Sequence, residues 1–245
     1  MASEQCDMKP YYESGGITIY HGDCREIMAG LQRFDAIVTD PPYPSAGGVP
    51  IVGAGVGRRI EPSISVGEPW GFSLNWIEAA RKLRPCHWVV FCNYRMLGPL
   101  ASCLPPSNVF VWRKSNAPRM ARNVPRMDCE FILWSRSDGA SCGRMGEFQS
   151  SVLDVPMPQA GVMARERELA DGSLKAAHPC QKPIAVVSPF LERLGARAII
   201  DPFMGTGTTL VVAKSLGLTT VGIEIEEKYC EIAVKRLAQE VLFTS

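Results

Sequence analysis

The sequence predicts a doubly wound α/β domain with a mostly parallel sheet of about seven strands, one of them antiparallel. Short apolar runs, typical of strands buried on both faces, alternate with segments of helical periodicity. Two of these runs end in turns rich in Asp, Pro or Gly, where sheets of this class bind ligands. With 245 residues, 46% of them hydrophobic, the chain is expected to form a single domain, 1–245, with a sizeable buried core.

Strands and helices alternate through the first half of the chain as a parallel sheet requires. Strands are expected at residues 17–21, 34–39, 87–92, 109–112 and 130–134, and helices at 25–31 and 74–83. In the second helix, Leu74, Ile77 and Leu83 share one side, and basic residues near its end favour the helix dipole. The connection between the last two of these strands is about fifteen residues long and polar, which is compatible with an antiparallel pair.

The C-terminal third has the clearest pattern. A helix at 183–194 leads to a strand at 198–200, a glycine-rich turn, a helix at 210–216, a strand at 219–223 and a last helix at 228–241. Two stretches, 44–69 and 139–177, have no clean period and contain many turn residues. Loops of this length within a compact domain are usually functional or disordered.

Composition excludes several classes of protein. Lys and Arg number 26 against 25 Asp and Glu, so a polycation is excluded and any nucleic-acid binding must use local patches. No apolar run approaches the roughly 20 residues that span a bilayer, and the first residues do not resemble a signal peptide. The nine cysteines include no C-x-x-C pair, so we expect neither a disulfide framework nor a metal, and a reducing cytoplasm suits them.

The glycine-rich turn D-P-F-M-G-T-G-T-T at 201–209 is a candidate ligand site. Gly205 and Gly207 allow the backbone to approach a ligand, and Glu224, at the end of the next strand, can accept hydrogen bonds from ribose hydroxyls. A P-loop needs a lysine after the glycines, and a dinucleotide fingerprint needs a third Gly or Ala where Leu210 stands. A ligand with a ribose and a carboxylate but no phosphate fits better, and S-adenosylmethionine is such a ligand. A tight turn without any ligand is the alternative.

The tetrapeptide D-P-P-Y at 40–43 follows a buried strand and faces the same crevice. An exocyclic amino group on a base ring is a poor nucleophile because its lone pair is delocalised, so it needs acceptors for its hydrogens. Asp40 and the carbonyl of Pro41 can be these acceptors, Pro41 and Pro42 hold the backbone rigid, and Tyr43 offers a face for a flipped base. The alternative is a turn with a stacked tyrosine.

Together these motifs resemble those of the S-adenosylmethionine-dependent DNA amino-methyltransferases, which methylate N6 of adenine or N4 of cytosine. The third family segment, H-P-x-x-K-P, appears at 178–183. The catalytic motif precedes the cofactor motif, a circularly permuted order similar to the family's beta group. The resemblance implies a Rossmann-like methyltransferase fold and S-adenosylmethionine as the cofactor.

The two sets of site residues expected on these grounds share the crevice. The catalytic set is Asp40, Pro41, Pro42 and Tyr43. The cofactor-binding set is Asp23, Asp40, His178, Lys182, Asp201, Phe203, Gly205, Gly207, Thr208, Thr209 and Glu224.

Three members of the cofactor set also have simpler interpretations. The resemblance implies that Asp23 meets the adenine end of the cofactor, but Asp23 also suits the N-cap of the following helix. His178 and Lys182 are expected in a loop over the methionine end, with His178 as scaffold rather than base. Their alternative is a rigid loop in which Lys182-Pro183 starts a helix.

The basic residues outside the motifs are candidate DNA contacts. Seven basic and three acidic residues lie between Val111 and Gly146, a local charge of +4, although a charge run this mild is usually a solvated face. Target recognition is expected from the insertions 44–69 and 113–177. The expected DNA-binding residues are Arg58, Arg59, Arg113, Lys114, Arg119, Arg122 and Arg126.

The resulting functional hypothesis is transfer of a methyl group to N6 of adenine in a short DNA sequence, since Asp rather than Ser opens the catalytic motif. N4-cytosine is the alternative base. An RNA or protein-glutamine methyltransferase and a non-catalytic DNA-binding module are the rival classes. The expected partners are double-stranded DNA and, optionally, a cognate restriction endonuclease, with no membrane. A monomer or homodimer, cytoplasmic and nucleoid-associated through DNA, is expected.

Overall fold

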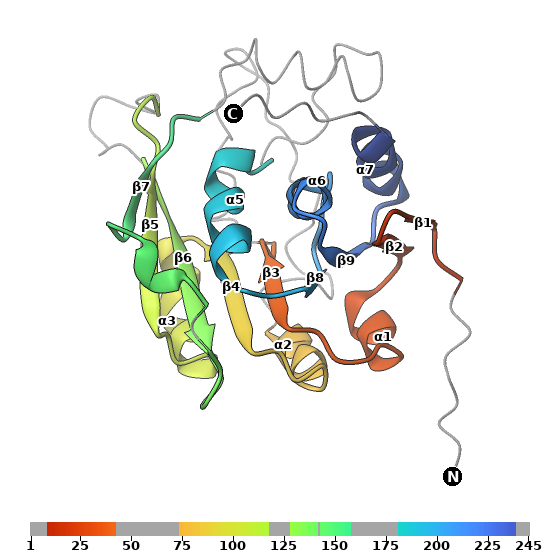
Figure 1. Cartoon of the computed structure of the whole chain (residues 1–245), viewed down its shortest axis with the longest axis horizontal. Coiled ribbons are helices and arrows are strands. Elements are labelled where there is room, and N and C mark those ends of the chain that lie inside the picture. The colour runs from red at the N-terminus through yellow and green to blue at the C-terminus, as the bar shows by residue number, and fades with distance from the viewer. Residues whose placement is uncertain (1–8, 43–73, 118–127, 142, 158–180, 239–245) are drawn as a thin grey trace.

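A nine-stranded sheet forms the centre of the molecule, with strand order β1-β2-β9-β8-β3-β4-β6-β5-β7. The computed structural model describes residues 9–42, 74–117, 128–141, 143–157 and 181–238 (Figure 1). Its strands are β1 Tyr12–Ser14, β2 Ile17–His21, β3 Ala36–Thr39, β4 His87–Cys92, β5 Asn108–Arg113, β6 Cys129–Arg136, β7 Val152–Asp154, β8 Ala198–Asp201 and β9 Thr219–Glu224. Its helices are α1 Cys24–Ala29, α2 Asn75–Arg81, α3 Tyr94–Cys103, the 3-10 turn η1 Met145–Glu147, α5 Ile184–Arg193, α6 Thr208–Ser215 and α7 Glu227–Ala238.

The predicted fold class is confirmed, but the predicted strand count is too low. The described residues form nine strands, and β1 and β6 rather than one strand run antiparallel to the rest. β1 and β7, the two edge strands, have three residues each, too few to produce a period of two. The predicted antiparallel pairing of the strands at 109–112 and 130–134 is confirmed by β5 and β6.

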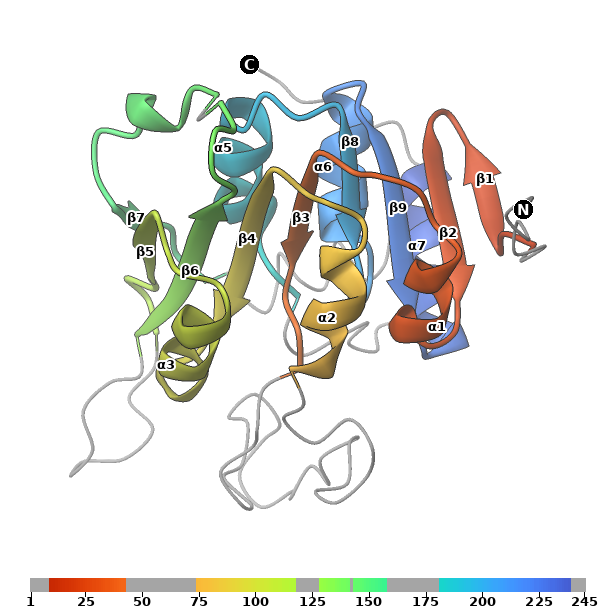
Figure 2. The same cartoon turned by 90° about the horizontal axis from the view of Figure 1, so that it is seen from below.

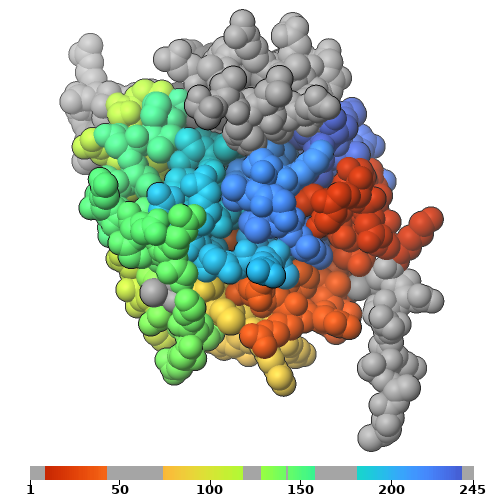
Figure 3. Space-filling view, viewed as in Figure 1, coloured from red at the N-terminus to blue at the C-terminus, as the bar shows by residue number. Residues whose placement is uncertain are grey.

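Two layers of helices cover the sheet. Figure 2 shows α1, α2 and α3 in front of the sheet, with α5, α6 and α7 behind it. The apolar side chains form two cores accordingly, one that includes Trp76, Ile77 and Leu100 and one that includes Phe190, Leu210 and Ala233. In the space-filling view, α5, α6 and α7 lie next to one another across their face (Figure 3). The apolar strands β3, β4 and β8 are thus buried on both faces, as expected of strands in a parallel sheet.

The strand order reverses between β8 and β3, which are parallel neighbours. From β3 the chain continues to β4 on one side, and from β8 it continues to β9 on the other. Ligands bind at such a reversal, outside the carboxyl ends of the strands. β2, near the start of the chain, lies beside the last strand, β9: the two are parallel, and His21 pairs in register with Glu224.

One helix, α3 at Tyr94–Cys103, is absent from the sequence prediction. Asn93 caps it by accepting hydrogen bonds from the backbone N–H groups of Arg95 and Met96. Gly98 and Pro99 interrupt its helical signal, while Met96 and Leu100 still bury one side against the sheet. In the described part of the chain, no helix is long and apolar enough to cross a bilayer.

Candidate active site

The end of β3 carries the catalytic motif and is tied to the end of β8. Thr39 is buried, and its hydroxyl donates a 2.7 Å hydrogen bond to Oδ1 of Asp201. Asp40 follows at the carboxyl end, with its side chain 25% exposed. A buried hydrogen bond therefore joins the residue that precedes the catalytic motif to the first residue of the cofactor motif, 162 positions later in the sequence.

Asp201 lies inside this junction. Its Oδ1 also accepts from the backbone N–H of Phe203 at 3.1 Å, and Thr209 bonds the same carboxyl group. Burial, helped by the nearby charge of Asp40, raises the pKa of Asp201 to about 7 against the lowering effect of these hydrogen bonds. The structure thus uses Asp201, expected as a cofactor residue, to brace the two strands beneath the site.

The two glycines of the turn have different tasks. Both have left-handed backbones, with φ of 52° at Gly205 and 78° at Gly207. A Cβ on Gly205 would meet no atom of the described residues within 4 Å, so this glycine borders open space at the site. A Cβ on Gly207 would lie 2.9 Å from Cβ of Ala233, so this glycine allows α6 and α7 to approach closely.

A buried arginine of α7 fixes the turn from behind. Arg236 donates to the carbonyl of Thr206 at 2.6 Å and to the hydroxyls of Thr206 and Thr208 at 3.1 and 3.3 Å. The Thr206 hydroxyl donates to Oε1 of Gln181 at 3.2 Å, which brings the segment before α5 onto the turn. Thr208 and Thr209 are both buried, so they support the turn more than they line the site.

Glu224 ends β9 beside the turn. Its two carboxylate oxygens accept from the N–H groups of Gly205 at 3.0 Å and Glu226 at 2.9 Å. Burial raises the pKa of Glu224, while the hydrogen bonds from Glu226 and Gly205 oppose that rise. A carboxylate has about four lone-pair sites, so the backbone hydrogen bonds from Gly205, Ile225 and Glu226 still leave room for a further donor such as a ribose hydroxyl. The Glu224 carboxylate can accept hydrogen bonds from the ribose of S-adenosylmethionine, and the open space beside Gly205 leaves room for the cofactor.

Asp23 and Phe203 lie on the α1–α3 side of the site. Asp23 is the N-cap of α1, accepting from the N–H of Arg25 at 2.8 Å and pairing with the Arg25 guanidinium at 2.6 Å. Hydrogen bonds from Arg25 hold the pKa of Asp23 below its usual value. Phe203 packs edge-on against Trp76, with 5.4 Å between the ring centres. The predicted capping role of Asp23 is confirmed, and its contact with the cofactor stays a prediction.

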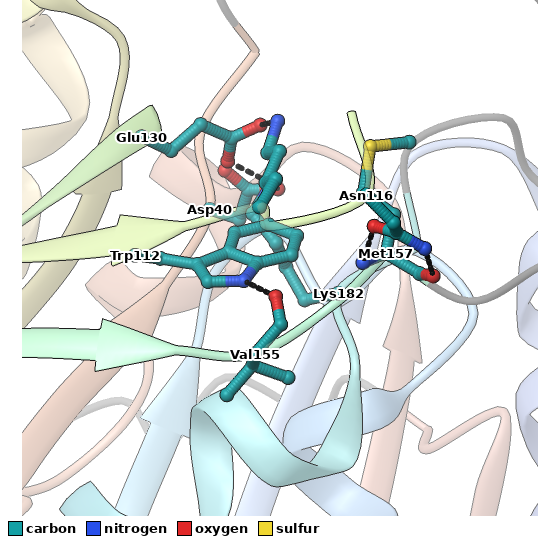
Figure 4. Close-up of polar contacts among 8 residues, drawn as sticks. Asp40, Trp112, Asn116, Glu130, Val155, Met157 and Lys182 are labelled. Carbon is teal, nitrogen blue, oxygen red and sulfur yellow. Dashed lines mark hydrogen bonds and ion pairs between the residues drawn. The ribbon is translucent and has the colours of Figure 1, made fainter. Parts of the chain in front are cut away.

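An alternating chain of charges leads away from Asp40 (Figure 4). Nζ of Lys182 lies 2.5 Å from Oδ2 of Asp40 and 3.3 Å from Oε2 of Glu130. Nζ of Lys114 lies 2.5 Å from the other carboxylate oxygen of Glu130. Burial alone would raise the pKa of Glu130, but Lys182 and Lys114 outweigh it and hold that pKa below its ordinary value. Sequence reasoning did not single out Glu130 and assigned Lys114 to DNA.

The structure describes only some of the remaining predicted catalytic and DNA-binding residues. Pro41 is buried and Pro42 is half-buried after Asp40. The exposed side chain of Arg113 forms an ion pair with Asp154. The segments 129–136 and 152–154 of the predicted insertion 113–177 are strands of the sheet. Several expected residues lie outside the described ranges: Tyr43, Arg58, Arg59, Arg119, Arg122, Arg126 and His178.

Comparison with known proteins gives consistent relatives. The family model described as DNA methylase matches residues 34–235. The type II methyltransferase M.ScaI of Streptomyces caespitosus is 26% identical over 95% of this chain and 84% of its own length. M2.LlaDCHI of Lactococcus lactis subsp. cremoris, also a type II methyltransferase, is 29% identical over 94% of this chain and 92% of its own length.

Solved structures show the same arrangement. The crystal structure of the M1.HpyAVI–SAM complex has a TM-score of 0.64 and 26% identity, and the match covers 91% of this chain and all of that one. The PvuII DNA methyltransferase, described as cytosine-N4-specific, has a TM-score of 0.66 over 96% of this chain. At 15% identity, the second likeness concerns the fold alone.

Proposed function

Because the chain belongs to the S-adenosylmethionine-dependent N6/N4 DNA methylase family, we propose that it methylates the exocyclic N6 of adenine within a short DNA sequence. The observation that carries the proposal is the buried hydrogen bond from Thr39 to Asp201, which holds Asp40 and the glycine turn together at the carboxyl ends of β3 and β8. A methyl donor on the turn and an amino group at Asp40 would then be neighbours. Such positioning accounts for much of the rate in reactions that need no covalent intermediate.

The residues proposed to hold the cofactor surround the turn. Glu224 accepts hydrogen bonds from the ribose hydroxyls of the cofactor, and Gly205 lets the backbone of the turn approach it closely. Asp23 borders the adenine end of the cofactor. The bound cofactor supplies an electrophilic methyl group on a sulfonium centre. Lys182 follows Gln181, which contacts the turn through Thr206. Lys182 and His178 are proposed to act at the methionine end of the cofactor.

The chemistry proposed for the catalytic motif concerns the amino group of the target base. Asp40 and the carbonyl of Pro41 accept its two hydrogens, so the nitrogen can pyramidalise and its lone pair can attack. Tyr43 stacks on the base once it has left the duplex. Methylation leaves a positively charged nitrogen, which loses its proton readily, so no strong base is required.

Adenine is proposed over cytosine because Asp, not Ser, begins the motif. Membership of a DNA methylase family favours DNA over RNA or a glutamine side chain as substrate. The type II relatives support a role in restriction–modification with a cognate endonuclease, in the cytoplasm where the DNA lies. A monomer and a homodimer both accommodate this role.

Recognition is proposed to come from residues 44–69 and from the parts of 113–177 that lie outside the strands. Arg113 has an exposed guanidinium, so a phosphate could compete with Asp154 for it. The side chain of Lys114 is 14% exposed and forms an ion pair with Glu130. A direct contact between Lys114 and a phosphate is therefore less favoured than one by Arg113.

The proposal is tested by incubating the protein with unmethylated duplex DNA and the cofactor, followed by mass spectrometry of the nucleosides. N6-methyl-2′-deoxyadenosine is the expected product. Detection of methylation at N4 of cytosine would instead identify cytosine as the target base. If no methylated base is detected, the alternative of a non-catalytic DNA-binding module is favoured. Sequencing that reports modified bases then gives the target site.

A further inference from the structure

We propose that Glu130 and Lys114 are positioning residues for methyl transfer, which hold the Lys182 ammonium at Oδ2 of Asp40 and thereby fix the plane of the catalytic carboxylate. The inference rests on the proposed function, in which Asp40 accepts a hydrogen from the substrate amino group. No motif identifies either residue: Glu130 stands on β6 and Lys114 directly follows β5.

The geometry of Lys182 shows why it needs a second partner. Its side chain is 7% exposed and runs between the two carboxylates (Figure 4). The distances from its Nζ are 2.5 Å to Asp40 and 3.3 Å to Glu130. An ammonium held on two sides has a fixed position, whereas one held by Asp40 alone could follow that carboxylate as it rotates. Glu130 therefore helps to orient Lys182 and, through it, the Asp40 carboxylate.

The charge of Glu130 has a second effect on Asp40. A lone ammonium would concentrate its positive charge on Asp40 and weaken that carboxylate as an acceptor for the substrate amino group. Glu130 shares this charge. Lys114 in turn neutralises Glu130 at 2.5 Å, so the four groups alternate in sign and balance.

The outer end of the chain is built rigidly, as a positioning device requires. The Lys114 ammonium lies 4.8 Å from the Trp112 ring centre, and the Trp112 indole donates to the carbonyl of Val155 at 2.7 Å. Asn116 bonds both the N–H and the carbonyl of Met157, at 2.6 and 2.7 Å (Figure 4). These contacts bind the end of β5 to the segment after β7, so the strands that carry Glu130 and Lys114 have a stiff support.

The test compares Glu130→Gln with the wild type at saturating cofactor and DNA. We expect the single-turnover rate of methyl transfer to fall at least about tenfold, as for loss of a positioned polar group. The dissociation constant of the cofactor should stay within about threefold, because the glycine turn and Glu224 are untouched. Glu78→Gln is the matched control, since it removes an exposed ion pair with Arg81 on α2 and should leave the rate unchanged.

The double variant Lys114→Met/Glu130→Gln separates positioning from stability. Glu130→Gln leaves the ammonium groups of Lys114 and Lys182 without the carboxylate that they share. The second change, Lys114→Met, removes one of these two charges. We expect thermal stability to recover in the double variant while the rate stays low. Recovery of both would reduce Glu130 to a charge-balancing role and overturn the proposal, as would a wild-type rate in Glu130→Gln.

A readout that needs no activity keeps this inference separate from the proposed function. Side-chain NMR of Lys182 should detect an ammonium protected from exchange in the wild type and unprotected in Glu130→Gln. An unchanged Lys182 signal would overturn the positioning role whether or not the protein methylates DNA. If the wild type methylates no base but the signal changes as expected, the proposed function fails and the Glu130–Lys182 linkage stands.

Discussion

Asp201 gives the sharpest prediction about stability, because burial raises its pKa to about 7 from 3.8. Between these two values the folded protein binds more protons at this group than the unfolded chain does. The free energy of unfolding therefore falls as pH rises through this window, and the loss is complete above about pH 7. The contribution is opposite in sign to that of a salt-bridged carboxylate, which stabilises as pH rises.

Asp201→Asn removes this titration while retaining the contacts. The amide oxygen can still accept from Thr39 and Phe203, and the amide nitrogen can donate to the hydroxyl of Thr209. Relative to the wild type, the variant should gain about 3 kcal/mol in the free energy of unfolding between about pH 4.5 and pH 7.5.

Urea denaturation of both proteins at several pH values measures this difference. Asp154→Asn is the control, because Arg113 lowers the pKa of that exposed carboxyl group and no such gain should appear. A pH-independent difference between Asp201→Asn and the wild type would refute the reasoning, since the buried carboxyl would then titrate as it does in the unfolded chain.

Substitutions in and around the glycine turn distinguish residues that bind the cofactor from residues that stabilise the fold. Gly205→Val fills open space at the site, so calorimetry should detect loss of cofactor binding; its left-handed backbone also lowers the free energy of unfolding, without preventing folding. Glu224→Ala should weaken cofactor binding by about 1–3 kcal/mol in the same assay. Gly207→Ala meets Ala233 with a left-handed backbone and should lower the free energy of unfolding by about 1–3 kcal/mol in urea. Arg236→Met leaves a turn carbonyl without its charged donor and should cost about 1.5–3 kcal/mol of stability in the same denaturation assay.

The sequence predicted the sheet well where the strands are apolar. The runs that became β3, β4, β8 and β9 are mostly buried, as expected of parallel strands, and their order placed Asp40 and the glycine turn at the same end of the sheet. Helix α3 was missed because Gly98 and Pro99 break its pattern, although packing of Met96 and Leu100 outweighs their low propensity. Tertiary burial overrides local preference in such cases.

The parts of the site that could not be predicted depend on contacts between distant residues. Asp201 belongs to a recognisable motif, but its burial against Thr39 of β3 is visible only in the fold. Arg236 lies on the last helix, α7, and its hydrogen bond to the carbonyl of Thr206 in the turn is likewise visible only in the fold. Lys114 was counted among basic residues available to DNA because a charge tally does not show that Glu130 lies opposite it.

The central claim is that Asp40 polarises the amino group that receives the methyl group. Single-turnover methylation of duplex DNA by Asp40→Ala, with cofactor affinity measured on the same protein, tests it most directly. We predict a fall in rate of roughly 10²–10³, as for loss of a positioned acceptor, with cofactor affinity largely retained. Methylation by Asp40→Ala at the wild-type rate would contradict the account and leave the D-P-P-Y segment as a turn without catalytic function.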